Sequence, residues 1–120
     1  MYISHILKRD GTLKPFKIDK ITTAIHKAMI AVGRGNKADA EVISQTVIQV
    51  LEQIKKTDSR YTPSIEGIQN IVEDKLMSSD FHTAAKAYIL YRNEQKHKRE
   101  KNIFEKRIHL KPYEYPEILE

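Results

Sequence analysis

The sequence contains no cysteine, and this absence excludes several classes of site. Without a thiol there is no disulfide, no thiolate metal site and no cysteine nucleophile. No apolar run reaches the roughly 18 residues that a membrane span needs. The first residues also lack the charged-then-apolar order of a signal peptide. We therefore expect a cytoplasmic protein with no membrane partner.

Several signatures of catalysis and metal binding are missing as well. The sequence has no G-x-x-x-x-G-K-[ST] loop and no nucleophile elbow, which argues against a P-loop hydrolase and a hydrolytic triad. Its five histidines show no paired spacing of the kind found in zinc sites. We expect no catalytic residue and no metal-ligating residue in this chain.

The composition favours one domain with an anionic partner. With 120 residues and 40% hydrophobic content, the chain is long enough for one compact core. The 21 basic residues outnumber the 16 acidic ones, for a formal charge of +5. A nucleotide, a nucleic acid and an acidic protein surface all suit this charge, and the charge does not choose among them.

The order of predicted elements is a hairpin followed by four helices. Runs of alternating character flank Asp10-Gly11 within residues 2–18, a strong hairpin signal. Apolar residues at helical spacing then predict four helices. Their predicted limits are Asp19 as N-cap to Gly33, Asn36 to residues 55–58, Thr62 as N-cap with Pro63 as first helical residue to Ser78-Ser79, and Asp80 as N-cap to about Asn102.

These elements predict an α+β fold, a four-helix bundle capped by a small antiparallel sheet. Residues 103–120 contain Pro112 and Pro116 and show no sustained period, so we predict a linker there.

Five cations lie on and just after the predicted hairpin: Lys8, Arg9, Lys14, Lys17 and Lys20. Lysine and arginine hold phosphate through charge-assisted hydrogen bonds, and Gly11 lets the backbone approach closely. The start of the first helix adds backbone amides and a favourable dipole end. A triphosphate site is one interpretation, and lysines that discourage edge-to-edge strand pairing are the other. Composition leaves both open.

Two blocks of sequence resemble the ATP-cone family of nucleotide-binding regulatory domains. The first block consists of Ile6–Gly11, Pro15-Phe16, Asp19–Ile21 and Ala24-Ile25, and the second of Ser64–Glu73, Leu76-Met77 and Ala85–Arg92. The blocks stand in the family's order and together span roughly residues 3–96.

The resemblance implies a nucleotide between the hairpin and the helices. Ile6, Leu7 and Ile21 would line the adenine, and Lys8, Arg9 and Lys20 would meet phosphates, with Lys14 and Lys17 at positions where members vary. The residues implied to close the pocket or to build a second nucleotide site are Ser64, Gln69, Lys86, Tyr91, Arg92, Asn93 and Lys96. For Tyr91, core packing and base stacking stay equally open, whereas Tyr88 is expected in the core.

The family's role implies allosteric control of a ribonucleotide reductase by residues 1–100, without catalysis by the domain itself. ATP would permit activity, and dATP would inhibit it by joining subunits into an inactive oligomer, with a coupling of about 1–3 kcal/mol. Mg²⁺ would arrive with the nucleotide and be held mainly by its phosphates. Discrimination between ATP and dATP would come from groups near the ribose, for which Gln69 and Ser64 are our candidates, or from how many nucleotides the domain holds.

The last twelve residues resemble the opening segment of a class I ribonucleotide reductase small subunit. We therefore expect residues 101–120 to lead into such a subunit, with other reductase subunits as partners. The basic charge leaves a nucleic-acid-binding module as one alternative, although the sequence shows no helix-turn-helix turn and no aromatic strand face. The helices leave an oligomerisation module as another.

We predict that Lys8→Ala and Arg9→Ala each weaken dATP binding with little loss of fold, because both residues belong to an exposed hairpin turn. Calorimetric titration of the two variants measures this. Unchanged affinity would remove both residues from the site.

Overall fold

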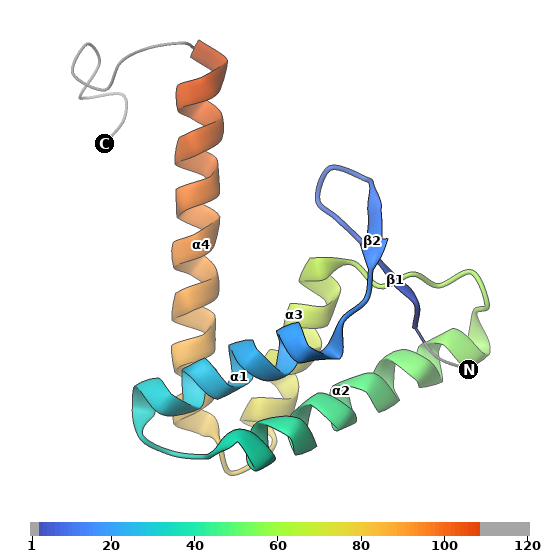
Figure 1. Ribbon diagram of the computed structural model, residues 1–120, viewed down its shortest axis with the longest axis vertical. Helices are drawn as coiled ribbons and strands as arrows, with labels where there is room; N and C mark the ends of the chain where they lie inside the picture. Colours follow the sequence, from blue (N-terminus) through green and yellow to red (C-terminus); the bar gives the residue numbers. More distant parts are fainter. Residues whose placement is uncertain (1–2, 109–120) are drawn as a thin grey trace. The chain divides into compact units, whose positions relative to one another are not determined.

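The computed structural model describes the backbone of residues 3–108 and the side chains of residues 3–102. Two strands, β1 (His5–Leu7) and β2 (Leu13–Pro15), precede four helices. The helices are α1 (Ile18–Val32), α2 (Lys37–Thr57), α3 (Ile65–Met77) and α4 (His82–Ile108), as Figure 1 shows. The chain divides after Tyr88 into two compact units, so the hairpin, α1, α2, α3 and the start of α4 form the first unit. This confirms the predicted α+β class.

The hairpin forms at the predicted turn. β1 and β2 are antiparallel, with Ile6 opposite Lys14. Gly11 adopts a φ of 87°, a left-handed conformation that glycine tolerates without steric cost. Asp10 Oδ1 accepts hydrogen bonds from the Thr12 hydroxyl (2.6 Å) and the Thr12 backbone N–H (3.0 Å). These bonds, the hydroxyl first, hold the pKa of Asp10 below its usual value. Asp10 therefore serves the turn.

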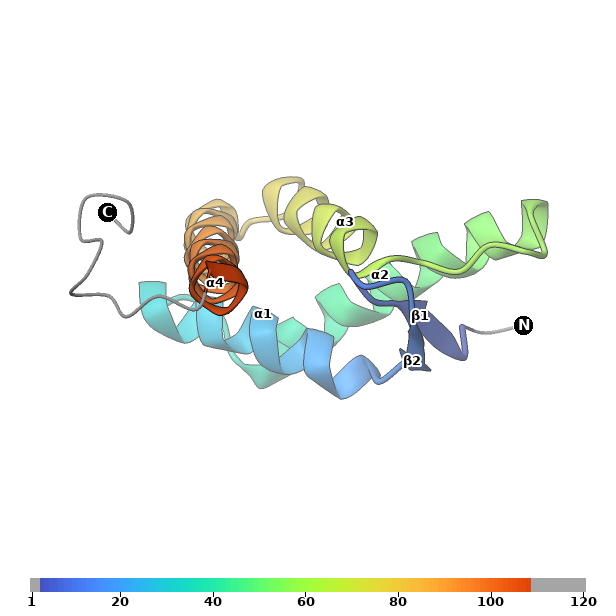
Figure 2. The ribbon, with the colours of Figure 1, turned by 90° about the horizontal axis from the view of Figure 1, so that it is seen from above.

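The hairpin is attached to the segment that leads into α3. The Leu7 N–H donates to the Pro63 carbonyl (2.9 Å), and Leu7 and Ser64 form a parallel bridge. Strand alternation directs Ile6 into the core and leaves Leu7 37% exposed. Figure 1 and Figure 2 both show the hairpin beside the first turn of α3.

The helices bury one stripe each in a common core. The fully or nearly fully buried residues are Ile25, Ala28 and Met29 of α1, Ala40, Ile43, Val47 and Leu51 of α2, Ile68, Val72 and Leu76 of α3, and Ala84, Ala85 and Tyr88 of α4. Their spacing of three and four residues is that of amphipathic helices. Ser44, also buried, donates to the Ala40 carbonyl (2.9 Å) and shares a hydrogen bond with the Thr22 hydroxyl (2.7 Å), which joins α1 to α2.

Four predicted helix limits are confirmed: the ends of α1, α2 and α3, and the start of α2. The α2 helix ends at Thr57, and α3 ends at Met77 with Ser78 as its C-cap. The α1 helix ends at Gly33, whose φ of 66° is left-handed. Asn36 caps α2 in a capping box: its side chain accepts from the Asp39 N–H (2.9 Å), and the Asp39 side chain accepts from the Asn36 N–H (3.0 Å).

Two predicted helix starts were wrong. The N-cap of α1 is Lys17, without a side-chain cap, and Asp19 lies in the first turn, where its charge suits the helix dipole. Pro63 lies before α3 rather than in it, because its carbonyl is engaged by Leu7. Ser64 is the cap instead, and its hydroxyl accepts from the Gly67 N–H (2.9 Å).

The limits of α4 also differ from the prediction. Phe81 rather than Asp80 occupies the N-cap position, and its carbonyl accepts from the Ala85 N–H (2.9 Å). The helix continues to Ile108, so residues 103–108, predicted as linker, are helical. This segment has no glycine or proline to stop a helix. The remaining predicted linker, residues 109–120, lies outside the described residues.

We predict that Leu76→Ala lowers the free energy of unfolding by about 2–5 kcal/mol, because Leu76 is fully buried and its truncation leaves a cavity. Met77, the next residue, is 45% exposed, so Met77→Ala should change the free energy by no more than about 0.5 kcal/mol. Urea denaturation of both variants measures the difference. Equal losses would contradict this core.

Candidate functional site

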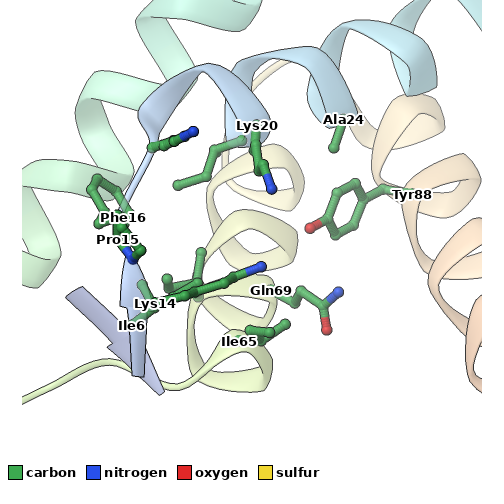
Figure 3. Close-up of a pocket in the computed structure, with 12 residues that line it drawn as sticks. Ile6, Lys14, Pro15, Phe16, Lys20, Ala24, Ile65, Gln69 and Tyr88 are labelled. Atoms are coloured by element: carbon green, nitrogen blue, oxygen red, sulfur yellow. The ribbon is translucent and has the colours of Figure 1, made fainter. Parts of the chain in front are cut away.

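A cavity of about 210 Å³ lies within the first unit, between the hairpin, α1, α3 and the start of α4. Figure 3 shows the residues that surround it. They are Ile6, Lys14, Pro15, Phe16, Lys17, Lys20, Ile21, Ala24, Ile65, Ile68, Gln69 and Tyr88. The lining therefore combines a mainly apolar wall with three lysines and one carboxamide.

Local geometry explains why these residues share one cavity. Ile6 and Lys14 are cross-strand partners, so their side chains are neighbours on one face of the hairpin. On each of two helices, lining residues three or four positions apart fall on one face. These are Lys20, Ile21 and Ala24 on α1, and Ile65, Ile68 and Gln69 on α3.

Positive charge gathers at the cavity. In Figure 3 the side-chain ends of Lys14 and Lys20 point into the same space. Partial burial, followed by the charges of Lys20, Lys8 and Arg9, lowers the pKa of Lys14. Each of these effects disfavours the charged form of Lys14, and a bound anion would offset them. The arrangement suits an anionic ligand.

The start of α1 adds to this positive field. Lys17, Lys20 and Ile21 all line the cavity, and all lie at or beside the first turn of α1. The side chain of Lys17, the N-cap residue, makes no capping hydrogen bond. Backbone amides and the positive end of the helix dipole favour an anion near such a turn.

The aromatic side chains of Phe16 and Tyr88 lie on opposite sides of the cavity in Figure 3. Tyr88 is 7% exposed and belongs to the core as expected, but it also lines the cavity. Isoleucines from β1, α1 and α3 complete the apolar surface. Aromatic and aliphatic surface of this kind suits a flat apolar part of a ligand, and the lysines suit an anionic part.

Gln69 supplies an unpaired polar atom. Its Oε1 is buried and has no hydrogen-bond partner among the residues that the structure describes. A buried acceptor without a partner costs about 1–3 kcal/mol, and most such atoms in folded proteins are paired. A ligand with a suitably placed donor would supply the missing bond.

Six residues predicted for the site line the cavity: Ile6, Lys14, Lys17, Lys20, Ile21 and Gln69. The other predicted residues of the first unit lie elsewhere. Leu7 bonds to Pro63, and Ser64 caps α3. Arg9, on the hairpin turn beside Lys8, has its Nε 3.8 Å from Glu66 Oε1. Lys86 is exposed on α4.

The remaining predicted residues belong to the second unit, which begins at Ile89. Tyr91 is 49% exposed, Asn93 and Lys96 are exposed, and Arg92 is partly buried. A second nucleotide site made from these residues stays a prediction.

Six lining residues were not predicted for the site: Pro15, Phe16, Ala24, Ile65, Ile68 and Tyr88. All of them are apolar or aromatic, and on a helix such residues have the same spacing whether they face a core or a cavity. The signal that could have found Ile65 and Ile68 is their shared helical face with Gln69.

Clusters that could hold a metal ion and helices that could cross a membrane are absent from the described part of the chain. No group of three or more His, Asp or Glu side chains gathers there in a way that could hold a metal ion. No helix there is both long and apolar enough to cross a membrane.

The sequence is similar to one family of domains and to several known proteins. Residues 4–97 match the family model described as the ATP cone domain. A vitamin B12-dependent ribonucleoside-diphosphate reductase of Thermoplasma acidophilum is 43% identical over 103 residues, which cover 82% of this chain and 13% of the relative. An anaerobic ribonucleoside-triphosphate reductase of Escherichia coli is 37% identical over 97 residues, covering 81% and 13%.

A third relative is a ribonucleoside-diphosphate reductase subunit alpha of Chlamydia muridarum, 30% identical over 117 residues, which cover 91% of this chain and 11% of the relative. The chain thus spans 13% or less of the length of these three reductases. None of the three is named as a small subunit, so the parent inferred from residues 109–120 stays a prediction.

We predict that Lys14→Gln raises the melting temperature of the nucleotide-free chain slightly at pH 7 and low salt. The lowered pKa of Lys14 means that its charge is less favourable in the folded chain than in the unfolded one. The penalty is complete below the folded pKa and disappears above the unfolded value of about 10.4. The advantage of Lys14→Gln should therefore shrink as pH rises toward that value.

Melting curves of wild type, Lys14→Gln and Lys37→Gln between pH 7 and about 10.4 provide the test. Lys37 is an exposed residue at the start of α2, outside the cavity. A lower melting temperature for Lys14→Gln than for wild type at pH 7 would count against the repulsion.

Proposed function

The chain belongs to the ATP-cone family, and from that membership we propose that it is an allosteric regulatory domain that binds ATP or dATP in the cavity. The ligand's base lies among the apolar and aromatic side chains, and its phosphates lie toward the lysines. The domain carries no catalysis of its own, and its parent protein is a ribonucleotide reductase. The names of its relatives support that parent.

The observation that carries this proposal is the meeting of two chemistries in one cavity. Phe16 and Tyr88 offer aromatic surface, and Lys14, Lys17 and Lys20 offer charge-assisted hydrogen bonds to phosphate. At about 210 Å³ the cavity is smaller than the ~300–1,000 Å³ of sites that enclose a whole drug-sized ligand. It suits the base, while the polyphosphate extends outward, where Lys8 and Arg9 of the hairpin turn add charge.

Regulation follows from a difference in affinity between assemblies. ATP permits reductase activity, and dATP inhibits it because the dATP-loaded domain favours an inactive oligomer of reductase subunits. A ligand shifts such an equilibrium only by its differential affinity for the two states, commonly about 1–3 kcal/mol. Mg²⁺ accompanies the nucleotide and is held mainly by its phosphates. A cytoplasmic location agrees with the absence of cysteine.

We predict saturable binding of both ATP and dATP in the presence of Mg²⁺, and weaker binding by about tenfold or more in Lys20→Gln. The loss corresponds to one hydrogen bond to a charged group, about 1.5–3 kcal/mol. Lys37→Gln, which removes an equal charge outside the cavity, should bind as wild type does. Calorimetry gives the affinities, and light scattering on the same samples gives the mass, which should rise with dATP and not with ATP.

Each part of the proposal has its own contrary result. If dATP does not bind saturably while oligonucleotides bind with steep salt dependence, the chain is a nucleic-acid-binding module instead. If both nucleotides bind but the mass never changes, nucleotide binding is supported. Inhibition through oligomers of this chain is then rejected. Equal nucleotide affinities of Lys20→Gln and wild type would show that Lys20 at the start of α1 does not bind the phosphates.

A further inference from the structure

Gln69 is the lining residue that neither phosphate binding nor stacking uses. Its Oε1 is buried and forms no hydrogen bond with any described residue. The Gln69 side chain is part of the cavity wall. A carbonyl oxygen of this kind accepts hydrogen bonds and cannot donate them. A ligand that completes it must therefore offer a hydrogen-bond donor.

Phosphate oxygens cannot play this part, because ionised phosphate oxygens are acceptors like Oε1 itself. The donor must come from the base or the sugar. Gln69 lies on the face of α3 that also carries Ile65 and Ile68, and these apolar residues line the cavity with it. In Figure 3 Gln69 lies on the same wall as Ile65. Apolar surface beside an acceptor suits a heteroaromatic base with an amino group at its edge.

We propose that Gln69 reads the base, with its Oε1 accepting a hydrogen bond from the exocyclic amine of a 6-aminopurine. This inference rests on the proposed function, since it places a nucleotide in the cavity. A 6-oxopurine would bring a second acceptor against Oε1, and a purine without a 6-substituent would leave Oε1 unpaired. Sites built around a hydrogen bond discriminate strongly against analogues that cannot form it.

The test measures the affinities of ATP, inosine triphosphate, purine riboside triphosphate and dATP by calorimetry. Wild type should bind ATP about 10- to 100-fold more tightly than either analogue that lacks the amine. Gln69→Leu should reduce this preference to within about threefold, while its affinity for purine riboside triphosphate stays near that of wild type. Gln53→Leu, an exposed glutamine on α2, should keep the full preference.

Two further measurements separate recognition from folding. Gln69→Glu keeps an acceptor at the same position, so it should retain the preference for ATP over purine riboside triphosphate even though its charge weakens binding of every triphosphate. Gln69→Leu should melt no lower than wild type, because it removes a buried acceptor that has no hydrogen-bond partner among the described residues.

Three results would overturn the inference. A preference for ATP over purine riboside triphosphate that survives in Gln69→Leu would show that another group reads the amine. Loss of the ATP-to-dATP ratio in Gln69→Leu, with the base preference intact, would assign Oε1 to the ribose hydroxyl. Tighter binding of inosine triphosphate than of ATP by wild type would mean that the carboxamide presents its Nε2 donor. Failure of wild type to bind any of the four would instead reject the proposed function itself.

Discussion

The hydrogen bond from the Leu7 N–H to the Pro63 carbonyl (2.9 Å) is the constraint on which the cavity depends. A two-stranded hairpin is marginally stable by itself. Here it gains this bond, the bridge to Ser64 and the burial of Ile6. The bond fixes the hairpin beside the start of α3, so that the wall made by Ile6 and Lys14 faces the wall made by α3. The same bond keeps Pro63 out of the helix, which leaves Ser64 as the cap.

The cavity also contains two groups that lower the stability of the fold. The pKa of Lys14 is lowered by partial burial and by neighbouring cations, and Gln69 Oε1 is buried without a partner in the described chain. Local departures from the rules of stable folding concentrate at functional sites. A ligand that brings an anion and a hydrogen-bond donor would relieve both. Ligand binding would then stabilise the folded chain by mass action, about 2.7 kcal/mol at a concentration one hundred times Kd.

The helices and strands could be predicted from the sequence, but several of the residues at which they begin could not. Asp10-Gly11 and the Asn36–Asp39 capping box act through neighbouring residues alone, so the hairpin and the start of α2 were predictable. The start of α3 was not, because Thr62 and Ser64 have similar capping ability and the distant Leu7 decides between them. In the site, the lysines were predictable from their charge. Phe16 and Ile65 were not, since apolar spacing does not distinguish a core from a cavity wall.

The exocyclic amine of the base and the 2′-hydroxyl of the ribose lie at opposite ends of adenosine, too far apart for one acceptor atom to pair with both. If Gln69 Oε1 pairs with the base, it does not pair with the ribose, and the hydroxyl that distinguishes ATP from dATP must be sensed by other groups. Ser64, the other candidate for that task, already accepts a hydrogen bond from the Gly67 N–H as the α3 cap. Neither the base contact nor the lysines can tell the two nucleotides apart, because both nucleotides carry the same base and the same phosphates. The proposed discrimination between ATP and dATP must then arise from other contacts to the sugar, or from a difference in how strongly the two loaded forms of the domain would bind its partners, since only differential affinity shifts an assembly equilibrium.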